Sequence, residues 1–178
     1  QIKIGSGEVD NIPFLRQVAR SKLPVILSTG MSYMSEVERA VKELKDHGCV
    51  RLSLLHCTSQ YPCQESDVNL SAMMSMKNLF KLPIGYSDHT TGFDASASAV
   101  AMGATILEKH FTIDRNLPGP DHKASLSTDD LRLYVEKIRA VETLMGSGIK
   151  KPTPYELQNR AKIRRRILAK TYLPKGTL

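Results

Sequence analysis

The stretch from Gly85 to Phe111, GYSDHTTGFDASASAVAMGATILEKHF, decides the fold class. The runs Pro83–Ser87 and Thr105–Leu107 have the apolar composition of short buried strands. Between them, the small residues of Phe93–Met102 suit a helix that packs closely against a sheet. A strand, a helix and a second strand of this length form a βαβ unit, whose two strands are parallel neighbours. The stretch therefore predicts an α/β fold.

Two histidines, His89 and His110, follow the two strands of this unit. They are expected at the same carboxyl end of adjacent strands, where α/β barrels hold their catalytic residues. Two imidazoles at that place could share one metal ion. A histidine at a strand end is more often a hydrogen-bonded structural residue, so the pair alone leaves both interpretations open.

The preceding part of the chain repeats the alternation of strand and helix. A helix is expected at Asn11–Arg20, with Asn11 as its cap and Pro13 in its first turn. Apolar residues at helical spacing predict another helix that starts at Ser35 and is stopped by His47-Gly48. Together with the βαβ unit this gives five parallel strands in an α/β pattern. The three earlier strands are expected at Gln1–Ile4, Pro24–Leu27 and Leu52–Leu55.

Polar residues follow every one of these five predicted strands. Ordinary loop chemistry places polar residues after strands, but it does not explain why hydroxyl groups, glycines and histidines recur at the same end. Converging hydroxyls and backbone amides suit a phosphate or another anion, and Lys3 can add a positive charge. The residues concerned are Ser6, Glu8, Ser28, Thr58, Ser59, Ser87, His89 and His110.

Composition limits the other classes of function. The 178 residues allow one or two domains, and the net charge of +7 is concentrated in Lys150–Lys175. Neither aromatic interleaving nor a known motif supports nucleic-acid binding there. Cys49, Cys57 and Cys63 lack zinc-site spacing and predict reduced thiols in a cytoplasmic protein. No apolar run approaches the ~20 residues of a membrane span, and no signal peptide is recognised.

Six short motifs follow one another along the chain, namely KIGSGE (Lys3–Glu8), ILSTGM (Ile26–Met31), LLHCTSQYP (Leu54–Pro62), GYSDHT (Gly85–Thr90), LEKHFT (Leu107–Thr112) and PGPDH (Pro118–His122). Together they resemble the sialic acid synthase family, whose members condense phosphoenolpyruvate with an N-acyl hexosamine to form nine-carbon sugar acids. The segments GPDHKASLS and GIKKPTPYELQNR look most similar to the bacterial legionaminate synthase branch.

The resemblance implies a (β/α)8 TIM barrel followed by a small antifreeze-like (SAF) domain. Residues 1–146 would then be the C-terminal part of the barrel, with its fourth to eighth strands. Residues 147–166 would be an exposed linker, and residues 167–178 the beginning of the antifreeze-like domain. The chain is thus expected to be an internal fragment of a protein that is a homodimer at full length. Its sheet should be open, with five strands in sequence order and unpaired outer edges.

The family pattern also implies roles for individual residues. His89 and His110 would bind a divalent metal, most consistent with Mn²⁺, although Mg²⁺ or Co²⁺ also fit. Glu8 would orient or deprotonate the water that adds to the reacting carbon, and Tyr61 and Asp121 would face the amino sugar. The residues expected to hold phosphoenolpyruvate are Lys3, Ser6, Ser28, Ser59 and Ser87.

The sequence departs from the usual family pattern at Ser59 and Cys63, which bear on sugar selectivity, and at Arg164–Ile167. Three alternatives remain beside a sialate or legionaminate synthase. Pseudaminate synthase is the nearest, and another phosphoenolpyruvate-dependent aldol-type synthase would share the barrel and the metal. The third is non-catalytic, namely an inactive fragment or a scaffold.

Overall fold

A computed structural model describes residues 1–177 of the chain. Contacts between Cα atoms divide the chain into one compact unit, Gln1–Gly146, and a second unit that begins at Ser147. The first unit contains the whole sheet and five of the α-helices. It therefore holds every residue for which the sequence predicts a catalytic or binding role.

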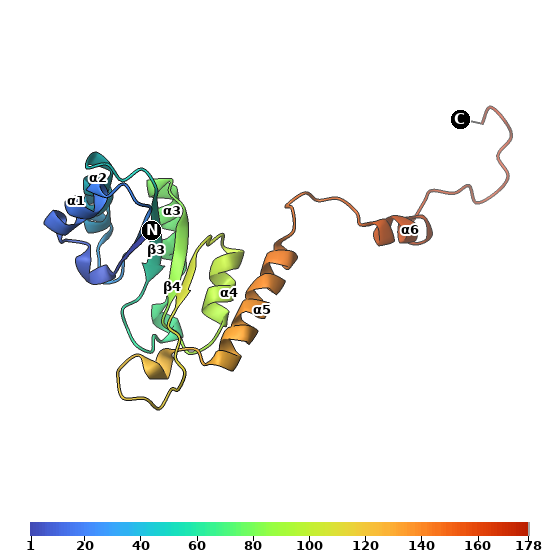
Figure 1. Ribbon diagram of the computed structural model, residues 1–178. Coiled ribbons are helices and arrows are strands. Elements are labelled where there is room, and N and C mark those ends of the chain that lie inside the picture. Colours follow the sequence, from blue (N-terminus) through green and yellow to red (C-terminus); the bar gives the residue numbers. More distant parts are fainter. Residues whose placement is uncertain (178) are drawn as a thin grey trace. The chain divides into compact units, whose positions relative to one another are not determined.

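The first unit is built on five parallel strands in the order β1-β2-β3-β4-β5, as predicted (Figure 1). Among the described residues, β1 pairs in the sheet only with β2, and β5 pairs only with β4. The sheet is therefore open at both edges. Both the strand order and the open edges agree with the prediction from the sequence. The strands are β1 (Ile2–Ile4), β2 (Val25–Ser28), β3 (Leu52–Cys57), β4 (Ile84–Asp88) and β5 (Leu107–Lys109).

Helices connect consecutive strands, and two of them begin at side-chain caps. Asn11 accepts a hydrogen bond from the N–H of Phe14, as expected for the cap of α1. Ser127 and Asp130 form a reciprocal capping box at the start of α5. The helices of this unit are α1 (Ile12–Arg20), α2 (Met34–Asp46), α3 (Ser71–Phe80), α4 (Asp94–Ala101) and α5 (Thr128–Met145).

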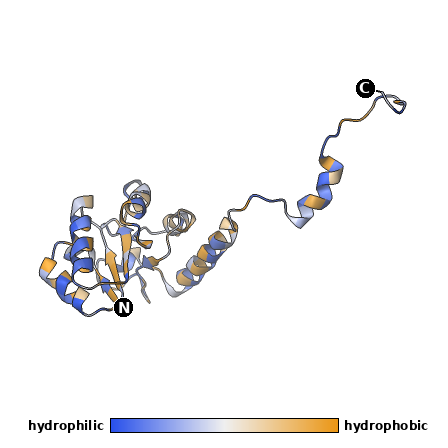
Figure 2. Ribbon diagram, turned by 90° about the horizontal axis from the view of Figure 1, so that it is seen from above, coloured by the Kyte–Doolittle hydropathy of each residue, from blue (hydrophilic) through white to orange (hydrophobic). Residues whose placement is uncertain are grey.

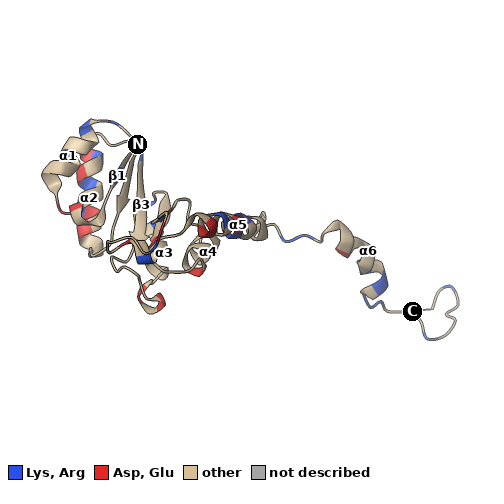
Figure 3. Ribbon diagram, turned by 60° about the horizontal axis from the view of Figure 1, so that its bottom comes forward, with Lys and Arg blue, Asp and Glu red and all other residues tan. Residues whose placement is uncertain are grey.

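The main apolar core lies between the helices and one face of the sheet. Viewed from above, the helices lie around the outside of the apolar strands (Figure 2). Successive side chains of a strand point to opposite faces, so alternate strand residues enter this core. Charged residues lie mainly on helices and loops (Figure 3). The helix-facing side of the strands is therefore apolar except at its carboxyl end, where Asp88 and Lys109 lie. Strand residues of the core include Ile4, Val25, Leu27, Leu52, Leu54, Ile84 and Tyr86.

The opposite face of the sheet is concave. Four strand spacings of about 4.8 Å would separate β1 from β5 by roughly 19 Å in a flat sheet. Nevertheless, Nζ of Lys3 on β1 lies 3.3 Å from Oε2 of Glu108 on β5. Side chains of the two edge strands can meet in this way only if the sheet curves around them. The five strands therefore form a half-barrel, and this concave side is called the inner face below.

The second unit contains one helix, α6 (Pro154–Ile163), which Thr153 caps by accepting a hydrogen bond from the N–H of Glu156. Residues 164–177 form no further helix or strand, so the start of an antifreeze-like domain stays a prediction. Within residues 1–177, no helix combines the length and the apolar character needed to cross a membrane.

Candidate active site

The inner face is polar toward the carboxyl ends of the strands. Lys3 lies beside Ile26 in the register, Cys57 lies beside Ser87, and Ser87 lies beside Glu108. Since side chains alternate along each strand, these residues share the inner face with Ser28, two positions after Ile26. The loops that follow the strands add Ser6, Gly30, Ser59, Tyr61, His89 and His110 at the same end.

The two histidines converge, as the sequence predicts. Their ring centroids lie 5.3 Å apart, and the rings are nearly perpendicular at 78°. Tyr61 joins them, with its ring centroid 4.3 Å from that of His89 and 5.5 Å from that of His110. Burial raises the pKa of the Tyr61 hydroxyl, so this group remains a hydrogen-bond donor at neutral pH. Three of the residues singled out in the sequence thus form one aromatic cluster.

Neighbouring oxygen atoms favour the same tautomer of both histidines. Nδ1 of His89 lies 2.7 Å from the carbonyl oxygen of Thr58. A carbonyl can only accept, so Nδ1 carries the proton in the neutral ring and Nε2 carries the lone pair. Oγ of Ser87 lies 3.4 Å from this Nε2, but it donates its hydrogen to Oε1 of Glu108 at 2.8 Å. Oδ2 of Asp121 lies 3.6 Å from Nδ1 of His110 and favours the same tautomer. Burial is the main cause that lowers the pKa of His89, which keeps this imidazole neutral, as a metal ligand must be.

The geometry of the pair fits a shared divalent ion. At a metal–nitrogen distance of about 2.1 Å, each ring centre would lie roughly 3.2 Å from the ion. Ring centres up to about 6.4 Å apart are then compatible with one ion, and the observed separation is 5.3 Å. No group of three or more His, Cys, Asp or Glu residues within the described chain is arranged to hold a metal.

A cluster of small polar groups lies beside the histidines. The N–H of Gly30 donates to Oγ of Ser6 at 2.8 Å, and the same oxygen lies 3.2 Å from Sγ of Cys57. Ser28 is 3% exposed, and within the described residues its Oγ has no hydrogen-bond partner. An unpaired buried hydroxyl costs free energy, so this group is suited to a ligand that supplies the missing bond.

Gly30 keeps this cluster open. A Cβ atom at this position would lie 2.4 Å from Oγ of Ser59, 2.9 Å from Sγ of Cys57 and 3.0 Å from Oγ of Ser6. We predict that Gly30→Ala raises the Michaelis constant for the anionic substrate at least about tenfold, the equivalent of one lost charge-assisted hydrogen bond. Steady-state kinetics measures it, and Gly7→Ala, with no atom within 4 Å of the added carbon, is the control. Unchanged kinetics in Gly30→Ala would contradict this role.

Glu108 is a site residue that the sequence alone does not single out. Oγ of Ser87 donates to its Oε1 at 2.8 Å, and Lys3 approaches its Oε2. The signal available was its position two residues before His110, which places both side chains on one face of the strand. Glu108 thus connects the cation of β1 with the hydroxyl of β4.

Glu8 is placed differently from the other predicted residues. It ends a short 3-10 helix, Ser6–Glu8, and its Oε2 accepts a hydrogen bond of 2.6 Å from Nδ2 of Asn11. Glu8 is half-buried next to the capping residue of α1. Its proposed action on a water molecule stays a prediction.

The inner face therefore combines two convergent imidazoles, an unpaired hydroxyl, and a lysine paired with a glutamate. Residues 1–150 match the NeuB family. The chain belongs to the NeuB family. The expected resemblance to sialic acid synthases is thereby confirmed.

Individual NeuB relatives agree with this assignment. The chain is 46% identical to the N,N'-diacetyllegionaminic acid synthase of Campylobacter jejuni, over 99% of this chain and 53% of the relative. It is 40% identical to human N-acetylneuraminate-9-phosphate synthase, over 99% of this chain and 49% of that protein. The chain thus spans about half the length of these curated relatives.

A solved NeuB-type structure confirms the fold. The crystal structure of an N-acetylneuraminic acid synthetase from Leptospira borgpetersenii superposes with a TM-score of 0.81 at 40% identity. The match covers 92% of this chain and 58% of that structure. The five-stranded half-barrel described above therefore corresponds to part of the barrel of that enzyme.

Proposed function

We propose that the full-length protein condenses phosphoenolpyruvate with an N-acyl hexosamine to form a sialic or legionaminic acid and inorganic phosphate. The sugar would be N-acetylmannosamine or a 2,4-diacetamido-2,4,6-trideoxymannose. The observation that carries this proposal is the convergence of the two histidine rings on the same inner face as Lys3 and the unpaired hydroxyl of Ser28. An anionic substrate and an aldehyde oxygen could both be bound there.

The residues of this chain then have separate roles toward phosphoenolpyruvate, the amino sugar and a water molecule. Lys3 would offset the charge of phosphoenolpyruvate, and serine hydroxyls would donate to its phosphate and carboxylate oxygens in a water-poor pocket. Tyr61 and Asp121 would bind the amino sugar, and Glu8 would orient or deprotonate a water molecule. The serines concerned are Ser6, Ser28, Ser59 and Ser87.

His89 and His110 would hold a divalent ion, for which we propose Mn²⁺, with Mg²⁺ or Co²⁺ as substitutes. Such an ion, when bound, supplies Lewis acidity to a carbonyl oxygen. Carbon 3 of phosphoenolpyruvate forms the new bond to the aldehyde carbon. Water then adds at carbon 2, and the bond between carbon 2 and the phosphate oxygen breaks. Of the two protons of this water, one goes to the former aldehyde oxygen and one leaves with the phosphate. The protein positions both substrates and excludes bulk water during these steps.

A coupled assay on the full-length protein tests this function. Phosphate release is measured with phosphoenolpyruvate and a panel of N-acyl hexosamines, and the sugar acid is identified by mass spectrometry. We expect phosphate release only when both substrates and a divalent ion are present. Phosphate release that does not depend on any sugar, or no turnover with the whole panel, would refute the proposal. Product analysis also distinguishes the alternative, pseudaminate synthase.

Lys3 offers a separate test of the phosphoenolpyruvate site. Its Nζ is already compensated by Glu108 at 3.3 Å and lies on the inner face rather than in the apolar core. We predict that Lys3→Ala raises the Michaelis constant for phosphoenolpyruvate about tenfold or more, since a charge-assisted contact contributes ~1.5–3 kcal/mol, and that the constant for the sugar changes little. Lys22→Ala, on an exposed turn after α1, is the control. Equal effects on both substrates would argue against a phosphate role.

We further propose a cytoplasmic homodimer. The three cysteines are all unpaired and buried, which suits a reducing compartment.

A further inference from the structure

A buried ion pair lies directly behind the histidines, on the helix side of the sheet. Nζ of Lys109 lies 3.0 Å from Oδ2 of Asp88, and the side chains are only 3% and 0% exposed. The two residues are register partners at the end of the β4–β5 ladder. Each directly precedes a histidine, Asp88 before His89 and Lys109 before His110.

Every oxygen of this carboxylate is hydrogen-bonded. Oδ1 of Asp88 accepts from the N–H and the hydroxyl of Thr90, both at 2.8 Å. Oδ2 accepts from Oγ of Ser96 on α4 at 2.6 Å, and the hydroxyl of Tyr134 on α5 donates to that Oγ at 3.0 Å. The pair therefore connects two strands with the two helices that cover them.

The pair reaches beyond the ladder to the segment that carries His89. Asp88 and Lys109 are the last paired residues of β4 and β5, so the strand ladder itself does not hold the histidines. Nζ of Lys109 also donates to the carbonyl oxygen of Thr90 at 2.6 Å. His89 is thus bracketed by two residues, Asp88 and Thr90, that are both bound to Lys109.

Stability alone is a weak reason for such a pair. Transferring two charges out of water is costly, and replacing a buried ion pair by apolar residues is often neutral or stabilising. Burial accordingly lowers the pKa of Lys109, and the opposing effect of the Asp88 carboxylate is smaller. Unlike apolar residues, the pair forms hydrogen bonds of defined direction at the ends of two strands.

We propose that Asp88 and Lys109 are positioning residues that hold the rings of His89 and His110 in the convergent arrangement that binds a divalent ion. This inference rests on the proposed function, because it takes the histidine pair to be the metal site. Neither side chain touches the ion or a substrate. They act through the backbone on either side of His89 and immediately before His110.

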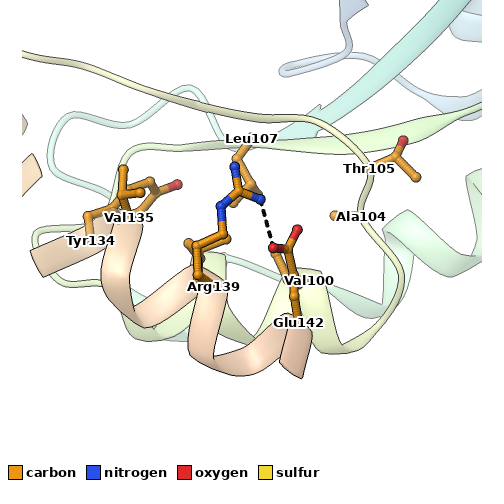
Figure 4. A pocket seen from close by; sticks show the side chains of 9 residues that line it. Val100, Ala104, Thr105, Leu107, Tyr134, Val135, Arg139 and Glu142 are labelled. Carbon is orange, nitrogen blue, oxygen red and sulfur yellow. Dashed lines mark hydrogen bonds and ion pairs between the residues drawn. The ribbon is translucent and has the colours of Figure 1, made fainter. Parts of the chain in front are cut away.

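The test compares Lys109→Met with the double variant Asp88→Asn/Lys109→Met in the full-length enzyme. The single variant leaves a buried charge unpaired, whereas the double variant removes both charges at nearly constant shape. The dissociation constant for Mn²⁺ is measured by electron paramagnetic resonance of the free ion, and the melting temperature by circular dichroism. Arg139→Gln is the control, because it removes the exposed Arg139–Glu142 ion pair on α5 that lies at a surface groove (Figure 4).

We expect both pair variants to bind Mn²⁺ at least about tenfold more weakly than wild type, the usual effect of losing an outer-shell partner. The double variant should regain most of the melting temperature lost in the single variant without regaining Mn²⁺ affinity. If Mn²⁺ affinity returns together with the melting temperature, the pair has only a structural role and the proposal is overturned.

Two further arms keep the result decisive. If Lys109→Met does not fold, the double variant and Tyr134→Phe are compared instead. Tyr134→Phe removes one hydrogen bond at the margin of the network, and it should weaken Mn²⁺ binding about twofold to threefold in a folded protein. Wild-type Mn²⁺ affinity in both would overturn the proposal. If His89→Ala binds Mn²⁺ as tightly as wild type, the metal site of the proposed function fails instead.

Discussion

We expect His89→Ala to abolish turnover in the full-length protein and to leave the fold largely intact. We expect a loss of roughly 10³-fold or more, because Lewis-acid stabilisation contributes several kcal/mol and each 1.4 kcal/mol is a factor of ten in rate. The fold should persist because the imidazole contacts Tyr61 and the carbonyl of Thr58 at a strand end, and it is absent from the main apolar core.

Phosphate release and Mn²⁺ binding are measured for this variant alongside His47→Ala. His47 caps the end of α2, where its Nδ1 lies 2.9 Å from the carbonyl of Glu43, and it should leave both properties unchanged. If the His89→Ala variant keeps more than a tenth of the wild-type turnover, the assignment of this residue to the metal site is wrong.

Gly85→Ala should have the largest effect on stability. A Cβ atom there would lie 2.3 Å from the carbonyl oxygen of Ile106 and 2.6 Å from Cδ2 of Leu55. The carbonyl of Ile106 cannot move away freely, because it accepts the N–H of Tyr86 at 2.9 Å in the β4–β5 pairing. We expect a loss of about 3 kcal/mol, the upper part of the usual range for overpacking in a core.

Urea unfolding of the full-length protein measures this loss, provided that the transition is two-state. Gly92→Ala is a matched control, because no atom lies within 4 Å of the added carbon and its backbone has no left-handed φ. A midpoint for Gly85→Ala equal to that of Gly92→Ala would show that the two strands can separate without loss, contrary to the close approach described here.

The strand–helix alternation and the histidine pair are predictable from the sequence because they depend on short-range patterns. Apolar runs bounded by polar residues locate β4, and the spacing of the βαβ unit places His89 and His110 at one end of the sheet. The last strand, Leu107–Lys109, overlaps the expected apolar run Thr105–Leu107 and continues to the residue before His110. Its pairing with β4 already begins before Leu107, because the N–H of Thr105 donates to the carbonyl of Ile84 and the carbonyl of Ile106 accepts from the N–H of Tyr86, both at 2.9 Å.

Contacts between distant strands could not be predicted from short-range patterns. Lys3 and Glu108 meet only because the sheet curves, and no local property of either residue encodes that curvature. The buried pair of Asp88 and Lys109 is equally hidden, since charged residues after a strand are normally solvated. Helix α5 is different, because its Ser127–Asp130 capping box is visible in the sequence and could have located its start.

The separation of an apolar helix side from a polar inner face has a practical consequence for redesign. Within one strand, residues of one parity anchor the helices and residues of the other parity face the ligands. Sugar preference could therefore be varied by randomising only inner-face positions that are not assigned to phosphoenolpyruvate, because these changes leave the helix-facing contacts of Leu54 and Tyr86 untouched. Selection for a new amino sugar would then sample mainly folded variants, so a variant without activity would be one that does not bind the sugar productively.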